Sequence, residues 1–428
     1  METLKVLLIA NRGEIAVRIP KTAKRLGICT IAIYTVADAT SQHVLAADIA
    51  ALLPGDDSTA YADGDAIIEI AQANNVDAII PGYGFLSENV EFAQKVLNRG
   101  MMFVGPSPDV IEGFGLKHCA REMAIRAKVP TVPGSEELLT SEEEVVVVAG
   151  ALGYPVQVKS RGDILFKNSG VFLERYYPVS HHVEVQIFGN SEGEAIHVGE
   201  RLREKLMSAA VVLAESVKYG LAGMVEYLVD DSSGDFSFLE MNTRLQVEHG
   251  ITELCYGIDL VEFMLNQADH QLSGRGGLPG QTLKALQRDT PFGSVIEARV
   301  YAKNPTHNYQ SSPGLLQLVE WNEVLGTRVD TWIETGTRTF IFCYPMIAKV
   351  MIHSSNRAEI IDKLHQVLII FKVYDPPTNF EFLGALLLAD KFQSNHTLTN
   401  FLNSFTFSLI TINIISPDTY IMIQDHPS

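Results

Sequence analysis

The chain has 428 residues, 46% of them hydrophobic and 20% charged, which allows roughly two to four packed domains and is ordinary for a soluble globular protein. Its formal net charge of -18 argues against nucleic acid and anionic membranes as partners, because a negative surface repels both. The sequence has neither a run of about 18 apolar residues, as a membrane span requires, nor a signal-like apolar segment at residues 1–10.

The four cysteines, Cys29, Cys119, Cys255 and Cys343, are far apart and form no Cys-x-x-Cys pair. This spacing is typical of free thiols in a reducing compartment. Together with the lack of a predicted signal segment or membrane span, it predicts a cytoplasmic protein.

Residues 1–120 alternate predicted strands and helices. Apolar runs predict strands at residues 6–10, 30–34, 78–80 and 102–104, and helices through Leu26, at 66–74 and at 91–98. This rhythm predicts a parallel sheet covered on both faces, as in a Rossmann-like domain. Ligand sites in such sheets lie at the carboxyl ends of strands, which is where residues 11–14 and 81–89 follow.

The rest of the chain predicts further mixed domains. Strands are expected at residues 154–159, 182–188, 236–240 and 295–302, and helices at 206–217, from Asp259 and at 358–367. Asp259 and Glu262 have the spacing of a capping box. The tail has two apolar strand-like runs around residues 416–418, which are too few to bury themselves. We expect four units, at residues 1–120, 121–290, 291–405 and 406–428.

The strongest chemical signal is an alternation of polar residues. Every second residue from Glu240 to Glu248 is polar, the others being Asn242, Arg244 and Gln246. In an extended segment these five side chains point to one side. An edge strand with a solvated face would also explain the pattern, but the apolar residues before it favour burial, and buried charges need ions or ligands.

Three oxygen-bearing side chains, Glu226, Glu240 and Asn242, form a candidate site for a hard cation. Mg²⁺ prefers a few protein oxygens, with substrate phosphates and water completing its shell. This signal alone is weak, because two acids and an asparagine often occur together by chance.

Three further cations and a histidine each have two interpretations. Lys117 and Lys159 are either solvated or point charges on nucleotide phosphate. His182 is either an ordinary core or surface residue or part of a pocket, and it cannot form a metal pair with His181, because neighbours on a strand face opposite ways. Arg328 is a surface arginine by default.

Six motifs occur together. They are Asn11-Arg-Gly-Glu-Ile-Ala-Val-Arg18, Pro81-Gly-Tyr-Gly-Phe-Leu-Ser-Glu-Asn89, Phe103-Val-Gly-Pro-Ser107, His182-Val-Glu-Val-Gln186, Glu240-Met-Asn-Thr-Arg-Leu-Gln-Val-Glu-His249 and Glu297-Ala-Arg299. With them the chain resembles the biotin carboxylase family over nearly its whole length. Within that family, Gly115-Leu-Lys-His118, Arg328-Val-Asp-Thr-Trp332 and Ile423-Gln-Asp-His-Pro427 are most similar to urea carboxylases.

The resemblance implies an α/β fold with an N-terminal Rossmann-like domain, a truncated ATP-grasp domain and a C-terminal mixed α+β domain. It implies that ATP and bicarbonate give carboxyphosphate and that the carboxyl group then passes to N1 of biotin. The implied ligands are ATP, Mg²⁺ or Mn²⁺, bicarbonate and biotin on a separate carrier. The implied partners are carrier and carboxyltransferase domains, and a homodimer is compatible with the family.

The resemblance also implies roles for single residues. Those implied to contact the nucleotide are Lys117, Lys159, Glu174 and His182, and those implied to hold the metal are Glu226, Glu240 and Asn242. Arg244, Gln246 and the backbone of Val247 would hold bicarbonate, Glu248 would be its general base, and Arg328 would stabilise the biotin enolate.

The chain departs from the family pattern in two places. After Ser160 the family has a glycine-rich loop whose N–H groups cover the ATP phosphates, but residues 161–170 lack that glycine cluster. After Arg201 the family has a basic segment, whereas here residues 202–205 run straight into a predicted helix. Without the cradle of donors the triphosphate loses positioning.

Three alternatives to a urea carboxylase component therefore stay open. The missing segments favour a non-catalytic remnant or a partner-binding paralogue. The chain is also compatible with the biotin carboxylase of an acyl-CoA or pyruvate carboxylase, or with a different ATP-grasp ligase, although the tail at residues 423–427 argues against both.

Overall fold

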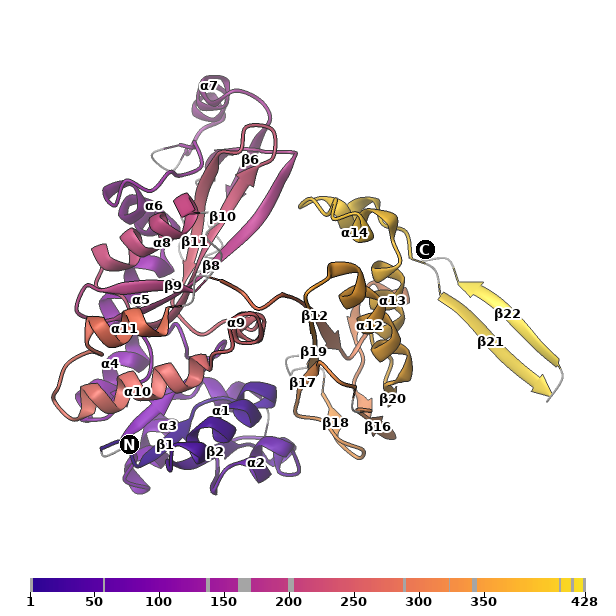
Figure 1. Ribbon diagram of the computed structural model, residues 1–428, viewed down its shortest axis with the longest axis horizontal. Coiled ribbons are helices and arrows are strands. Elements are labelled where there is room, and N and C mark those ends of the chain that lie inside the picture. The colour runs from indigo at the N-terminus through magenta and orange to yellow at the C-terminus, as the bar shows by residue number, and fades with distance from the viewer. Residues whose placement is uncertain are drawn as a thin grey trace.

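The computed structural model describes residues 3–56, 58–135, 139–160, 171–198, 204–287, 290–322, 324–340, 345–407, 409–416 and 419–425. The first departure from the family pattern, at residues 161–170, lies outside these ranges, as do residues 202 and 203 of the second, Cys343 and the last three residues of the tail, whereas Glu204 and Lys205 begin a described helix. Figure 1 shows the N-terminal region beside an antiparallel sheet, a third region next to both, and a hairpin at the C-terminal end.

The N-terminal region is a five-stranded parallel sheet in the order β3-β2-β1-β4-β5. Its elements are β1 (Val6–Ile9), α1 (Gly13–Arg25), β2 (Cys29–Tyr34), α2 (Gln42–Ala46), β3 (Ile49–Leu52), α3 (Gly64–Ala73), β4 (Ala78–Ile80), α4 (Val90–Asn98) and β5 (Met102–Phe103). Leu7, Leu8 and Ile9 have no exposed surface, as expected for a sheet covered on both faces. The predicted strand–helix alternation is confirmed here. The strand β3 was missed because its residues are mostly exposed, and the five-residue helix α2 was missed as well.

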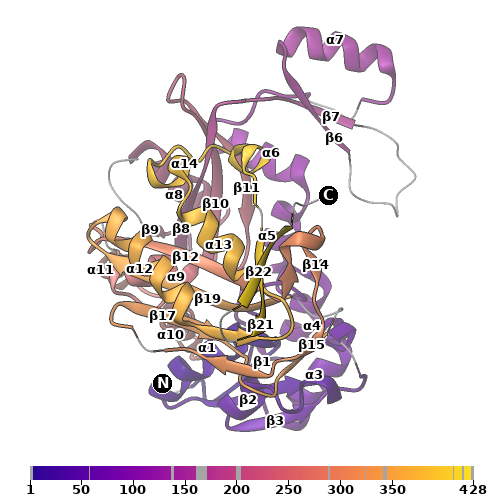
Figure 2. The same cartoon turned by 90° about the vertical axis from the view of Figure 1, so that its right-hand side faces the viewer.

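The central region contains a four-stranded antiparallel sheet in the order β11-β10-β8-β9. Its elements are α5 (Pro108–Gly115), α6 (Lys117–Arg126), α7 (Glu142–Leu152), β6 (Val156–Ser160), β7 (Val171–Arg175), β8 (Ser180–Asn190), β9 (Ala195–Val198), α8 (Glu204–Ser216), β10 (Gly220–Asp230), β11 (Phe236–Asn242), α9 (His249–Tyr256), α10 (Leu260–Leu272) and α11 (Gly280–Leu286). The β6–β7 pair and α7 extend away from this sheet (Figure 2).

The third region is built on an antiparallel sheet in the order β12-β19-β17. Its elements are β12 (Ser294–Tyr301), β13 (Lys303–Asn304), β14 (Gln310–Ser311), β15 (Gly314–Leu315), β16 (Leu318–Glu320), β17 (Thr327–Thr331), β18 (Arg338–Thr339), β19 (Met346–Ser354), α12 (Arg357–Ile370), β20 (Lys372–Tyr374), α13 (Phe380–Leu387) and α14 (Asp390–Gln393). The tail forms the hairpin β21 (Leu409–Ser416) and β22 (Thr419–Asp425), which projects from this region (Figure 1). None of the described helices is long and apolar enough to cross a membrane.

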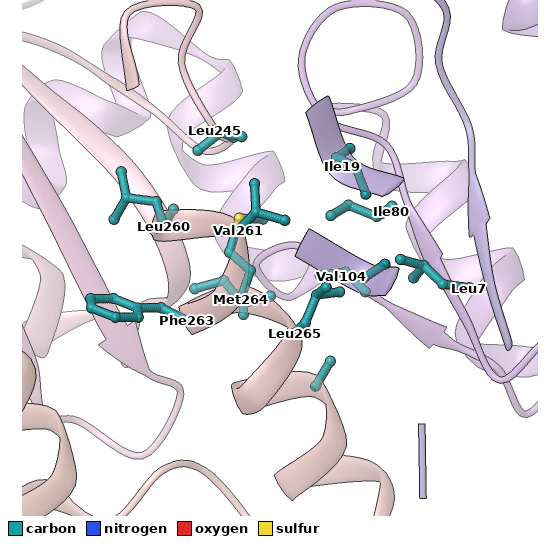
Figure 3. Close-up of a cluster of buried hydrophobic side chains, with 14 of the residues drawn as sticks. Leu7, Ile19, Ile80, Val104, Leu245, Leu260, Val261, Phe263, Met264 and Leu265 are labelled. Carbon is teal, nitrogen blue, oxygen red and sulfur yellow. The ribbon is translucent and has the colours of Figure 1, made fainter. Parts of the chain in front are cut away.

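Helix α10 joins the N-terminal and central regions. Its buried side chains, which include Leu260 and Leu265, pack with Leu7 and Ile80 of the parallel sheet in one apolar cluster (Figure 3). The helix begins where Asp259 accepts a hydrogen bond of 3.0 Å from the Glu262 N–H, as the capping spacing predicts.

The segment from Glu240 to Glu248 is not extended throughout, which corrects the prediction. Strand β11 ends at Asn242, and α9 begins at His249 after a turn in which the His249 N–H donates to the Gln246 carbonyl. The alternation of polar residues could not reveal this turn. The same spacing occurs in an extended strand and in a loop whose side chains hydrogen-bond to one another.

Replacing Leu265 by alanine should lower the free energy of unfolding by about 3 kcal/mol, because it removes a fully buried side chain and leaves a cavity between two regions. Urea denaturation measures the loss. The matched control is Leu402→Ala, at a side chain that is 56% exposed, which should change stability by less than about 0.5 kcal/mol. Equal losses in the two variants would contradict the packing role of α10.

Candidate active site

A row of three carboxylates crosses the central sheet. Glu226 on β10 is directly opposite Glu184 on β8 and Glu240 on β11. Directly opposite residues of antiparallel strands point to the same face, so the three acids lie side by side. Such a row is unfavourable without a cation or protons to offset the repulsion.

Glu226 is held between two neighbours. His182 Nε2 lies 2.7 Å from Glu226 Oε2, and the Asn242 amide donates to Glu226 Oε1. His182, Glu184 and Glu226 each have one atom that could bind a metal ion, and these three atoms lie within 4.8 Å of one another. The hydrogen bond to Glu226 raises the pKa of His182 above its ordinary value, against the effect of burial. This contact therefore favours the protonated form of the imidazole beside the carboxylate.

Arg244 continues the line of polar groups beyond the end of β11. It donates to Asn242 Oδ1 at 3.1 Å and to Gln246 Oε1 at 2.9 Å. Glu88, from the predicted ligand segment at residues 81–89, accepts from Arg244 Nε at 3.0 Å and from the Thr243 N–H at 3.1 Å. The N-terminal region thus fixes the beginning of the loop that follows β11.

A second row of charged residues crosses the sheet of the third region. Lys349 on β19 is directly opposite Arg299 on β12 and Asp330 on β17. Arg299 forms an ion pair with Glu248, and Lys349 Nζ donates to the Val247 carbonyl at 2.8 Å. Two consecutive residues at the end of the loop are therefore held from the third region.

Glu248 also lies beside Glu184, so it links the two rows. Burial and the neighbouring Glu248 raise the pKa of Glu184 to about 8. At neutral pH Glu184 is therefore protonated and can donate a hydrogen bond to the Glu248 carboxylate. The Glu248 carboxylate thus lies between the Glu184 carboxyl group and the Arg299 guanidinium.

Arg328 has a different environment. Its guanidinium donates to Asp330 Oδ2 at 2.7 Å and to Glu253 Oε2 at 2.8 Å. Although burial acts in the opposite direction, the hydrogen bonds and charge of Arg328 hold the pKa of Asp330 well below its ordinary range. Arg328 thus has two carboxylate partners within the protein. Among the described residues, none of its recorded hydrogen bonds or ion pairs reaches the loop at residues 243–248.

A cleft of about 210 Å³ lies on the other side of the carboxylate row. Its lining residues are Lys117, Arg121, Glu174, Glu226, Phe238, Leu239 and Glu240. Cations on α6 thus face carboxylates of the sheet across an apolar floor. Lys159 lies on β6, but its side chain is outside the described part of the chain, so its predicted phosphate contact stays a prediction.

These residues fit Mg²⁺ and a nucleotide. Glu226 and Glu240 offer hard oxygen ligands on neighbouring strands, and the cations Lys117 and Arg121 stand where phosphates would need them. The Asn242 amide turns its nitrogen to Glu226, so its oxygen would bind a cation only after a rotation of the amide.

Sequence reasoning singled out most members of this site but missed Arg121, Glu184 and Arg299. A signal existed for each. Arg121 follows Lys117 by four positions, so the two share a helix face. Glu184 and Arg299 belong to the quoted motifs, but only the strand register shows that they flank Glu226 and Lys349.

Family models match most of the chain. The model for the biotin carboxylase N-terminal domain matches residues 3–111, and that for the biotin carboxylase C-terminal domain matches 297–404. The ATP-binding domain model of the carbamoyl-phosphate synthase L chain matches residues 200–272.

Relatives extend these matches. A putative urea carboxylase of Emericella nidulans is 52% identical over 479 positions, covering 100% of this chain and 39% of that protein. Because 479 positions exceed the 428 residues of the chain, the relative has residues that this chain lacks. Biotin carboxylase 1 of Bacillus subtilis is 35% identical over 94% of this chain and 99% of its own length.

A solved structure has the same fold. It is the dimeric biotin carboxylase domain of Hydrogenobacter thermophilus 2-oxoglutarate carboxylase, in complex with MgADP, ADP and bicarbonate, with 29% identity and a TM-score of 0.85 over 94% of this chain and 98% of that one. Fold and site together define an ATP-dependent ligase of the ATP-grasp class. The chain belongs to the biotin carboxylase family, which confirms the resemblance and the predicted fold class.

The affinity for a divalent cation should fall at low pH, because the cation has to displace the protonated His182 from Glu226. Glu184, with a pKa of about 8, is already protonated at lower pH, so below the raised pKa of His182 the loss should approach about tenfold per pH unit. Mn²⁺ binding followed by electron paramagnetic resonance measures this. His182→Gln should flatten the dependence, and an equally steep slope in that variant would contradict the arrangement.

Proposed function

We propose that this chain carboxylates biotin at the expense of ATP, with bicarbonate as the carboxyl source. The observation that carries the proposal is a chain of hydrogen bonds from Glu226 through Asn242 and Arg244 to Gln246, with Glu248 two residues further along the same loop. Its two ends serve different chemistry, since one end is a metal and phosphate site and the other is a carboxylate beside an arginine. A phosphoryl group and an anion could meet only along such a line.

The loop suits a small planar anion. The Arg244 guanidinium brings a positive charge to the loop while its nitrogens also donate to Glu88, Asn242 and Gln246, and the Val247 and Glu248 N–H groups donate to no acceptor within the described residues. We propose that bicarbonate lies against these donors and that Glu248 removes its proton, which increases its nucleophilicity toward the γ-phosphate. Carboxyphosphate then has a good leaving group, which bicarbonate lacks.

The biotin enolate needs a nearby cation, and two arginines compete for that role. Arg328, predicted from the sequence, is held by Asp330 and Glu253. Arg299 is also held by two carboxylates, Glu297 and Glu248, but its side chain is more exposed, at 37% against 21% for Arg328, and one of its partners is the proposed base. We therefore propose Arg299 for the enolate, because its charge reaches the place where the bicarbonate proton is lost.

The nucleotide would bind in the cleft beside the carboxylate row. Lys117 and Arg121 would neutralise phosphates, and Mg²⁺ between Glu226 and Glu240 would join the triphosphate to the sheet. Glu174 and His182 are proposed as pocket residues on β7 and β8. The cleft, at about 210 Å³, is smaller than a typical nucleotide site of roughly 300 Å³ or more.

The acceptor after biotin is proposed to be urea. The supporting observations are the identity to the Emericella nidulans protein and the tail that continues past the third region as a hairpin. The chain spans 39% of that relative, and biotin carrier and carboxyltransferase domains are proposed as its partners. We also propose that the chain forms a homodimer and that it is cytoplasmic.

Nucleotide binding without turnover is a second candidate function. Two observations favour it. The chain lacks residues that the Emericella nidulans protein has, and its segments at residues 161–170 and 199–205 differ from the family pattern. Calorimetric titration with Mg·ATP and an assay of turnover separate the two candidates. Binding with no turnover would support the second, and binding with turnover the first.

Phosphate release from Mg·ATP should depend on both bicarbonate and free biotin. Glu248→Gln should reduce it by about 10² to 10⁴-fold, the usual contribution of a general base, while Mg·ATP affinity stays unchanged. Glu359→Gln, at an exposed acid on α12, is the matched control and should retain full activity. Equal rates in Glu248→Gln and the unchanged chain would exclude Glu248 as the base.

The two arginines should behave differently when replaced by methionine. Arg299→Met should lower kcat by about 10² to 10³-fold, and it should lower the melting temperature less than Arg328→Met does, since it leaves one buried acid, Glu297, without its partner instead of two. Arg328→Met should mainly lower the melting temperature, because it leaves the buried Asp330 and Glu253 without their partner. Steady-state kinetics and calorimetric melting separate these effects. A large loss of kcat in Arg328→Met with an unchanged melting temperature would return the enolate role to Arg328.

A further inference from the structure

Lys349 is the one lysine among the largest fully buried side chains of the described residues. It lies at the centre of β19, between Arg299 and Asp330. A buried ammonium costs several kcal/mol unless it is paired, so its surroundings should reveal why it is there.

Three acids surround Lys349. Glu14 Oε1 of α1 lies 3.0 Å from Nζ, and Asp330 Oδ2 lies 3.9 Å from it. Burial raises the pKa of the nearby Glu297, and the charge of Lys349 opposes that rise. Burial raises the pKa of Glu14 to about 7, and Lys349 opposes that rise. Tyr83, from the ligand segment of the N-terminal region, donates to Glu14 Oε1. The cation is thus kept in place from two regions of the fold.

The remaining contact of Lys349 is with the loop. Nζ donates to the Val247 carbonyl at 2.8 Å, a bond between residues 102 positions apart. That carbonyl belongs to the same peptide plane as the Glu248 N–H, and in a trans peptide the two point in opposite directions. Holding the carbonyl toward β19 therefore turns the Glu248 N–H away from β19.

We propose that Lys349 is a positioning residue that orients the Val247–Glu248 peptide so that its N–H faces the bicarbonate site. This inference rests on the proposed function, since it names what prepares the anion site for its substrate. Lys349 has no contact with substrate in this scheme. It acts through one peptide group, and its charge also strengthens that group as a donor.

Two variants test the proposal. Lys349→Met removes the hydrogen bond but leaves Glu14 buried beside no cation, so the double variant Glu14→Gln/Lys349→Met, which removes both charges, guards against simple misfolding. The KM for bicarbonate should rise about tenfold, as for the loss of one charge-assisted hydrogen bond, with the KM for Mg·ATP within about twofold. Lys363→Met, at a partly exposed lysine of α12, is the control.

A second readout does not need turnover. Hydrogen exchange of the amides at residues 244–250, measured by mass spectrometry, should accelerate in both variants and not in Lys363→Met. Parallel rises of both KM values, or an unchanged bicarbonate KM, would overturn the proposal. If the unchanged chain shows no turnover, the proposed function fails, and exchange at residues 244–250 alone decides the role of Lys349, with unchanged protection overturning it.

Discussion

The ion pair between Arg299 and Glu248 is the contact on which the site depends. The loop at residues 243–248 has no strand partner, so side chains from elsewhere must hold its backbone. Glu88 holds its beginning, and Arg299 and Lys349 hold its end. Each anchor comes from a region other than the one that contains the loop. The geometry of the site is therefore a property of how the three regions pack.

The register of the two sheets decides which charged side chains lie next to one another in the site. In the central sheet one register places Glu184, Glu226 and Glu240 in a row, and in the third sheet another places Arg299, Lys349 and Asp330 in a row. A shift by one residue in either sheet would move that row to the opposite face. Like charges on one sheet and mixed charges on the other give a site in which a metal, a phosphate and an anion can be neutralised separately.

Prediction from the sequence succeeded where local pattern decides structure. The parallel sheet, α10 with its Asp259 cap and the five polar residues after position 239 were all recognisable from short-range spacing. The extended conformation expected to residue 248 was wrong, because the turn before α9 depends on tertiary anchors. Arg299 and Lys349 could not be placed, since their partners lie 51 and 102 residues away along the chain. Register across the sheet, invisible to periodicity, was the missing information.

A single crystal structure can test where the metal and the anion bind in this site. With Mg·ADP and bicarbonate present, we expect the metal between Glu226 and Glu240, and the anion between the Arg244 guanidinium and the N–H groups of Val247 and Glu248. Bicarbonate bound away from that loop, or a metal bound without Glu226, would contradict the claim that this line of side chains is a single carboxylation site.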